Sequence, residues 1–184
     1  MYGCGVDSEA QREMVDRARH GDAAAWECLY RAVYPRLRAY ATARCGTAPA
    51  EDLVNETMAR AVASIRRFRW EANGFDPWLF GILRRVCAEH HRREGRQRRK
   101  DARVGPDRHG PDPTERVELA DDHAAVRKAF AQLTSDEREI LELRLISQLS
   151  AEDTGRLLGK QAGAVRTAQS RALANLRSLM EHHR

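Results

Sequence analysis

The stretch that decides the fold lies near the carboxy terminus, where residues 149–178 read LSAEDTGRLLGKQAGAVRTAQSRALANLRS. Ser150, followed by Asp153, has the pattern of an N-cap with an acidic residue three positions on, and it predicts a short helix that ends at Gly159. A second helix is predicted to follow at once and to run to the end of the stretch. Two helices joined by a tight glycine turn, with the small Gly155 where their backbones would come closest, describe a helix-turn-helix.

The second helix of this pair has a polar, basic face. Val165 is predicted to point back into the angle between the two helices, away from the polar side chains. From residue 160 to the end, the sequence has five basic residues and one acidic residue. Such a helix is what reading of the DNA major groove requires. An ordinary helical hairpin with a solvated face would show the same pattern, so this segment alone leaves that alternative open.

The rest of the chain is also predicted to be helical, because no segment alternates polar and apolar residues with a period of two. One helix is predicted over about residues 25–42, with a kink at Pro35. A second helix is predicted over about residues 50–67 and a third over about residues 76–94. The side of the 50–67 helix that we expect to be buried carries Val54, Met58, Ala61, Val62 and Ile65.

Between the two helical parts the apolar pattern stops, and glycine, proline and basic residues fill residues 92–116. We therefore predict an all-α protein made of two small helical domains joined by a flexible linker, the C-terminal one a helix-turn-helix. The predicted boundaries are a partly helical N-terminal segment over 1–21, a helical domain over 22–94, the linker over 95–117 and the second helical domain over 118–184.

Composition and termini exclude several classes of protein. Charged residues make up 32% of the chain, and its longest apolar stretch, residues 78–83, is followed at once by two arginines. No stretch approaches the roughly 18 apolar residues that span a bilayer. The first residues lack the basic and apolar regions of a secretory signal, so we expect a cytoplasmic protein without membrane contact.

The cysteines and histidines raise the question of a metal site. The four cysteines are widely spaced, which favours reduced thiols. Cys87, His90 and His91 stand at positions i, i+3 and i+4 of a predicted helix and could place three ligands beside a metal ion. The alternative is that Cys87 is a small apolar side chain that fills space in the core. The two histidines would then belong to the cationic run that follows. We expect no metal and no cofactor, and without a nucleophile–base pair or phosphate loop we predict no catalytic residue and no enzyme.

Four motifs occur in a specific order: AEDLVNET at 50–57, FDPWLFGI at 75–82, LTSDEREIL at 133–141 and the helix-turn-helix. In this order and at these separations the chain resembles the extracytoplasmic-function (ECF) sigma factors of the sigma-70 family. The resemblance implies a protein that binds core RNA polymerase, directs it to −10 and −35 promoter elements and initiates promoter opening and transcription. The alternative is a stand-alone helix-turn-helix regulator that uses its N-terminal half to oligomerise.

The resemblance assigns the partners to particular parts of the chain. The first helical domain corresponds to sigma region 2 and the second to region 4. Core RNA polymerase would be bound through the clamp helices of its largest subunit and the flap of its second subunit. The clamp-binding residues implied are Asp52, Asn55 and Glu56, where Asn55 replaces the family's usual glutamine. An exposed polar face beside an apolar stripe suits a protein partner that carries arginines. An anti-sigma factor is a further expected partner.

Promoter DNA is the remaining partner. The segment FRWEANGF at 68–75 resembles the loop that captures a base flipped out of the −10 element, where Trp70 would stack and Asn73 would hydrogen-bond. A place in the core is the alternative for Trp70. The −10 contacts implied on the next helix are Arg84, Arg85 and Arg92. The −35 contacts implied are Gln161, Arg166, Thr167, Ser170 and Arg171, although Ala168-Gln169 departs from the family's common Arg-Leu pair.

Overall fold

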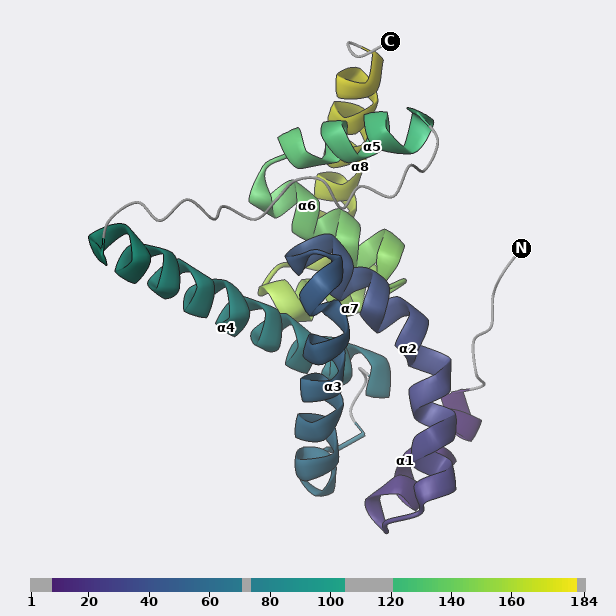
Figure 1. Ribbon diagram of the computed structural model, residues 1–184. Helices are drawn as coiled ribbons and strands as arrows, with labels where there is room; N and C mark the ends of the chain where they lie inside the picture. Colours follow the sequence, from purple (N-terminus) through teal and green to yellow (C-terminus); the bar gives the residue numbers. More distant parts are fainter. Residues whose placement is uncertain (1–7, 71–73, 105–120, 182–184) are drawn as a thin grey trace.

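The computed structural model describes residues 8–70, 74–104 and 121–181, and all regular structure in these residues is helical, as predicted. Figure 1 shows two groups of helices, from which the long α4 projects to one side. The N-terminal module contains α1 (Ser8–Arg19), α2 (Ala23–Cys45), α3 (Thr47–Ser64), a 3-10 turn (Ile65–Arg67) and α4 (Phe75–Val104). The C-terminal module contains α5 (Asp121–Gln132), α6 (Ser135–Leu141), a π-helical turn (Glu142–Ile146), α7 (Ala151–Leu158) and α8 (Ala162–Glu181).

Local sequence sets several helix ends. The Asp22 carboxylate accepts hydrogen bonds from the backbone N–H groups of Ala24 and Ala25, at 2.9 and 3.1 Å, and so begins α2. The helix continues through Pro35 and stops at Gly46, whose φ of 90° suits a residue without a Cβ. In the C-terminal module, α6 begins with a reciprocal capping box between Thr134 and Glu137.

The helix α4 is longer than the sequence predicts. The sequence predicts its end near residue 94, but the helix continues to Val104 and takes up the first part of the predicted linker. Gly95 lies inside it, and a single glycine in a helix costs only about 1 kcal/mol relative to alanine. Glu94 forms an i,i+4 ion pair with Arg98 at 3.6 Å, which supports an exposed helix without an apolar stripe. The rest of the predicted linker, residues 105–117, lies outside the described residues.

An aromatic cluster forms the centre of the N-terminal module. Phe68 contacts Trp70, Phe75 and Trp78, with ring centroids 5.9, 6.2 and 4.9 Å apart. Tyr40 of α2 meets Phe80 of α4 edge to face at 5.9 Å. These contacts hold α2, α4 and the segment after α3 together, so the region that resembles the base-capturing loop begins on a rigid support.

The two modules share part of one core. Leu143 and Leu149 of the C-terminal module are buried in the same cluster as the apolar residues of α2, α3 and α4. A separate small core in the C-terminal module contains Leu133, Leu141 and Ala172. The modules are therefore packed on each other rather than held apart.

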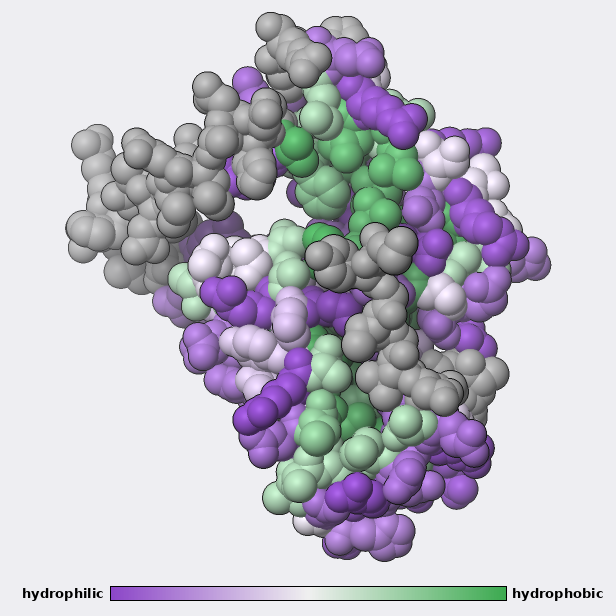
Figure 2. All heavy atoms as spheres, turned by 90° about the vertical axis from the view of Figure 1, so that its right-hand side faces the viewer, coloured by the Kyte–Doolittle hydropathy of each residue, from purple (hydrophilic) through white to green (hydrophobic). Residues whose placement is uncertain are grey.

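The surface is mainly polar, with a few apolar exceptions. Figure 2, which views the molecule from the right-hand side of Figure 1, shows polar residues around an apolar band that runs down this face. Among the described residues, large apolar side chains that are well exposed include Val62 and Leu145. Val62 is 52% exposed, so its predicted place on the buried side of the 50–67 helix is wrong.

Candidate nucleic-acid and protein interface

A tight turn builds the helix-turn-helix. Gly159 ends α7 in the left-handed region, with φ 66° and ψ 31°. The N–H of Lys160 then donates to the carbonyl of Gly155 at 2.7 Å. A Cβ on Gly155 would lie 2.4 Å from the Lys160 carbonyl oxygen, closer than any side chain tolerates. The prediction that Gly155 marks the closest backbone approach is confirmed.

Two further contacts fix α8 in this angle. Val165 is fully buried, as predicted for a side chain that points back between the helices. On the neighbouring side, Nε of Arg144 donates to the side-chain oxygen of Gln169 at 2.8 Å. Gln169 therefore joins α8 to the π-helical turn, a structural role that sequence reasoning missed because the two residues are far apart in the chain.

The residues predicted to read the −35 element lie on α8 or, for Gln161, directly before it. Arg166 pairs with Glu152 of α7 at 3.0 Å, with the two side chains 60% and 58% exposed. An ion pair this exposed contributes little stability, so its arginine can exchange Glu152 for another acceptor. Gln161, Arg166, Thr167, Ser170 and Arg171 are all exposed.

The face of α3 predicted to bind a protein is also exposed. Asp52 and Asn55 face solvent, and Val62 continues the same side of the helix two turns further on. Glu56 pairs with Arg60 at 2.8 Å, and Arg60 also binds both carboxylate oxygens of Glu89 on α4, at 3.1 and 2.7 Å. This bidentate contact holds α3 rigidly on α4 and leaves the outer face of α3 free to carry a partner.

A cavity of about 400 Å³ lies beside the segment that resembles the base-capturing loop. Arg85, one of the predicted −10 contacts, is exposed and lines this cavity. Trp70 does not line it; its half-buried ring packs edge-on against Phe68, in keeping with the core alternative. Sequence reasoning missed Trp78, whose half-buried ring forms part of the wall. The other lining residues are Arg67, Phe68, Arg69, Gly74, Pro77, Gly81, Ile82, Asp153, Arg156 and Leu157.

The remaining −10 residues have different positions. Nε of Arg84 donates to Glu139 of α6 at 2.7 Å, so this arginine is engaged by the C-terminal module. Arg92 is exposed on the part of α4 that projects from the molecule. Asn73 lies outside the described residues.

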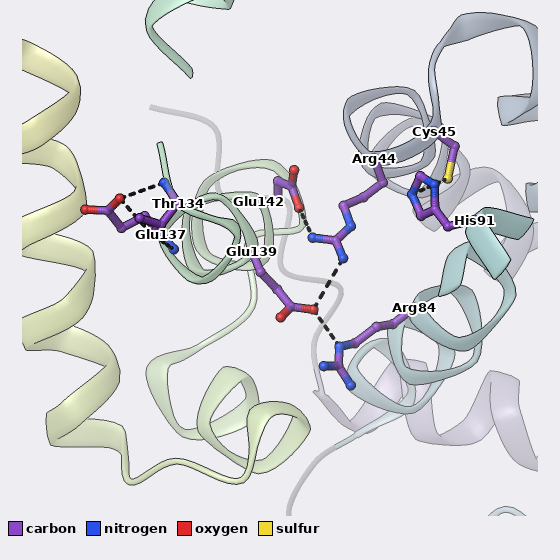
Figure 3. Close-up of polar contacts among 8 residues, drawn as sticks. All are labelled: Arg44, Cys45, Arg84, His91, Thr134, Glu137, Glu139 and Glu142. Carbon is purple, nitrogen blue, oxygen red and sulfur yellow. Dashed lines mark hydrogen bonds and ion pairs between the residues drawn. The ribbon is translucent and has the colours of Figure 1, made fainter. Parts of the chain in front are cut away.

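Arginines of the N-terminal module hold the C-terminal module. Arg44 of α2 lies between two glutamates (Figure 3). Its guanidinium group is 3.0 Å from the carboxylate of Glu142 and 3.7 Å from that of Glu139. Arg84 approaches Glu139 from α4, and Arg36 donates to the Ser147 carbonyl at 3.2 Å. Glu142 is only 2% exposed, so the Arg44 contact supplies the charge that this buried carboxylate needs. Part of the cavity wall belongs to α7, which means that this packing also completes one side of the cavity.

Comparisons with known proteins agree with this geometry. The family model for Sigma-70 region 2 matches residues 29–97, and that for Sigma-70, region 4 matches residues 129–178. The chain is 35% identical over 181 residues to the ECF RNA polymerase sigma factor ShbA of Streptomyces griseus, covering 91% of this chain and 94% of that one. It is 33% identical over 179 residues to the ECF RNA polymerase sigma factor SigD of Mycobacterium tuberculosis, covering 94% and 84%. The chain belongs to the ECF RNA polymerase sigma factors.

Solved structures show the same architecture. This sigma factor matches the sigma factor RpoE of Bartonella quintana, solved with the anti-sigma factor NepR, at 30% identity and a TM-score of 0.67 over 86% of this chain and 98% of that one. It also matches CnrH, solved with the cytosolic domain of CnrY, with a TM-score of 0.69 over 94% and 97%. At 21% identity the CnrH match shows the fold alone. As an ECF sigma factor, the chain directs RNA polymerase to promoters.

Two features of the described residues concern membrane spans and metal sites. Within residues 8–70, 74–104 and 121–181, no helix is long and apolar enough to cross a membrane. Over the same part of the chain, no group of three or more His, Cys, Asp or Glu side chains is arranged to hold a metal ion. His90 instead approaches Glu94 at 3.4 Å, while His91 turns toward Cys45 of α2.

Proposed function

We propose that this sigma factor binds core RNA polymerase through α3, opens the −10 element at the cavity beside Arg85 and reads the −35 element with α8. The observation that carries the proposal is that Asp52 and Asn55 on α3, Arg85 beside the cavity and Arg166 on α8 are all exposed, on three separate parts of the molecule. The stand-alone regulator is not favoured, because both sigma regions match in the expected order.

The exposed face of α3 combines polar side chains with one apolar residue. Asp52 and Asn55 offer acceptors for arginine or lysine side chains of a partner. Val62, 52% exposed at the other end of the same face, offers a contact that a partner would remove from water. A polar centre with an apolar end suits a helical protein surface such as the polymerase clamp better than it suits DNA.

The cavity beside Arg85 fits an extruded base. Its walls combine the aromatic rings of Phe68 and Trp78 with the guanidinium group of Arg85. Taking a base out of the DNA stack costs a few kcal/mol of free energy. Stacking of the extruded base on such groups offsets that cost. Because the cavity lies at the start of the base-capturing loop, it is a better candidate for stacking than the ring of Trp70.

Engagement of the −10 element requires that the modules move apart. Arg84 cannot bind a phosphate while it holds Glu139 at 2.7 Å. The residues of α7 that close the cavity, Asp153, Arg156 and Leu157, also stand where DNA would enter. We therefore assign the packed arrangement to the protein before it binds polymerase and promoter.

The remaining assignments follow from these surfaces. Region 2 is proposed to span residues 22–94, and α4 extends it to Val104. Region 4 is proposed to span residues 118–184. An anti-sigma factor is a proposed partner because RpoE of Bartonella quintana, a relative of the same fold, was solved with one. We propose that the protein acts in the cytoplasm and has no catalytic chemistry of its own.

The test compares two arginines of α4 in reconstituted transcription. Arg85→Ala removes a charge from the cavity, whereas Arg93→Ala removes a charge from an exposed position outside it. Holoenzyme that carries Arg85→Ala should bind promoter duplex normally but transcribe less from it, and a template with a pre-opened −10 bubble should restore transcription. Arg93→Ala should behave as the unaltered protein. Equal losses in both variants, or no rescue by the bubble, would contradict the role of the cavity.

A further inference from the structure

The part of α4 that projects from the N-terminal module carries a concentrated positive charge. Residues 92–100, which we call the α4 arm, contain six basic residues and one acidic residue. The helix continues through the arm to Val104 and extends to one side of the molecule (Figure 1). All six basic side chains are exposed. Of these, the proposed function uses only Arg92, so most of this charge has no task assigned to it.

Helical spacing gathers part of the charge into a stripe. Arg92, Arg96 and Arg99 follow Arg85 at intervals of seven, four and three residues, so all four lie on one side of α4. The buried Leu83 lies on the opposite side, where the helix packs on the module. Because Arg85 lines the cavity, the stripe starts there and runs outward along the arm. With a rise of about 1.5 Å per residue, the stripe is about 21 Å long.

The stripe has no counter-charge close to it in the described part of the chain. Glu94, the acidic residue of the arm, pairs with Arg98 at 3.6 Å on another side of the helix. Within that same part of the chain, no ion pair involves Arg92, Arg96 or Arg99. Like charges one turn apart weaken a helix. A polyanion bound along this side would therefore remove a repulsion that the free protein has to bear.

We propose that Arg96 and Arg99 bind phosphates of the duplex DNA between the −10 and −35 elements. The proposal rests on the proposed opening of the −10 element beside Arg85, because DNA that delivers a base to the cavity continues past it along the stripe. In the chain, α4 is followed by the module proposed to read the −35 element. The duplex on the −35 side of the cavity is therefore the part that we assign to the arm.

The chemistry of the arm suits phosphates better than a protein surface. Arginine presents a planar fork of donors that binds phosphate oxygens in pairs. A stripe of about 21 Å spans roughly six base pairs of phosphates, at about 3.4 Å for each step along a strand. Residues 91–100 contain no apolar side chain. The centre of a protein interface, in contrast, is poor in charge and rich in aromatic or apolar anchors.

The first test compares two double variants with the same change in charge. Arg96→Gln with Arg99→Gln removes the stripe, whereas Arg93→Gln with Arg98→Gln removes two charges of the arm that lie off it. Glutamine keeps the helix propensity of arginine, which circular dichroism can verify. The probe is a promoter duplex that the unaltered holoenzyme enriches from genomic DNA, and its binding is measured at several salt concentrations.

Loss of the stripe should make the slope of log affinity against log salt shallower by about 1–2, because up to two phosphate contacts disappear. The off-stripe variant should keep the slope of the unaltered protein. An unchanged slope in the stripe variant would overturn the proposal. Equal changes in both variants would do so as well, since they would show that only the total charge of the arm matters.

Neutral phosphates locate the contact on the DNA. Methylphosphonates placed between the −10 and −35 elements should weaken binding by the unaltered and the off-stripe holoenzymes, but not by the stripe variant. An equal effect on all three proteins would contradict the assignment. Sensitivity that appears only for phosphates downstream of the −10 element would place the arm on the wrong side of the cavity.

Two controls separate this proposal from its neighbours. Both double variants should bind core RNA polymerase as the unaltered protein does, and a loss confined to the stripe variant would assign the stripe to an acidic polymerase surface instead. Failure of the −10 proposal has another signature. If the open bubble does not rescue Arg85→Ala, the role of the cavity falls whatever the salt slope shows. If the bubble rescues Arg85→Ala and the stripe variant has a normal slope, only the role of the arm falls.

Discussion

Replacement of Arg44 by methionine tests how the two modules are held together. Glu142, whose side chain is 2% exposed, hydrogen-bonds Arg44 at 3.0 Å. Methionine keeps most of the apolar stem of Arg44 and removes its charge. Glu142 is then left as a buried carboxylate whose nearest positive charge has been taken away.

The expected loss follows from the burial of the pair. Breaking a buried ion pair from one side costs about 3–5 kcal/mol of unfolding free energy. Because Arg44 itself is 25% exposed, water weakens the contact, and we expect the lower end, about 3 kcal/mol. The loss of unfolding free energy also has an upper limit. If the modules separate, Glu142 regains water, so the loss cannot exceed the free energy that holds the modules together.

The pH dependence of this loss has a definite sign. Burial raises the pKa of Glu142 above its ordinary value, and Arg44 opposes that rise. Arg44→Met therefore raises the pKa of Glu142 further. A carboxyl whose pKa is higher in the folded state favours the folded protein when protonated. That stabilisation is full below the unfolded pKa of about 4.3 and is lost as the pH rises through the folded pKa. The deficit of the variant should be full at pH 7 and shrink toward pH 4.

Urea unfolding followed by circular dichroism measures both effects. Arg31→Met is the matched control, because Arg31 pairs with Glu27 at 2.5 Å on the surface, where such a pair contributes about 0–1 kcal/mol. Glu142→Gln, combined with Arg44→Met, should recover much of the loss since no buried charge remains. If Arg44→Met were as stable at pH 7 as Arg31→Met, or if its deficit grew as the pH fell, Arg44 would not be what compensates the buried Glu142 carboxylate.

Three further predictions concern the proposed surfaces. Asp52→Ala with Asn55→Ala should weaken binding to core RNA polymerase in a pull-down without a loss of helicity, and full retention of affinity would remove α3 from the interface. Gly155→Ala should destabilise the helix-turn-helix by about 1–3 kcal/mol in thermal unfolding, since its Cβ would meet the Lys160 carbonyl at 2.4 Å. In holoenzyme binding to a −35 library at fixed salt, Arg166→Ala should flatten the preference at one or two positions by about 1–3 kcal/mol. Arg177→Ala should lower all affinities evenly or not at all; equal losses in both variants would show that Arg166 does not read bases.

Several features of the site could be predicted because they depend on residues close together in the chain. Ser150, Gly155 and Gly159 specify a cap, a close approach and a left-handed turn within ten residues, and the structure has all three. The exposed faces of α3 and α8 followed from helical periodicity in the same way. The end of α4 was misplaced because the residues after 94 lack an apolar stripe, yet charged residues of high helix propensity sustain an exposed helix.

The sequence by itself therefore determined the helices, their polar faces, the tight turn and the family, since each is written in spacings of a few residues or in motif order. The tertiary structure alone decided that Arg44 and Arg84 meet Glu139 and Glu142, that Trp78 rather than Trp70 lines the cavity, and that the Cys45 sulfur contacts His91. The physical reason is that these contacts join helices distant in sequence. Their partners are chosen by how apolar faces pack in three dimensions, and no local period encodes that choice.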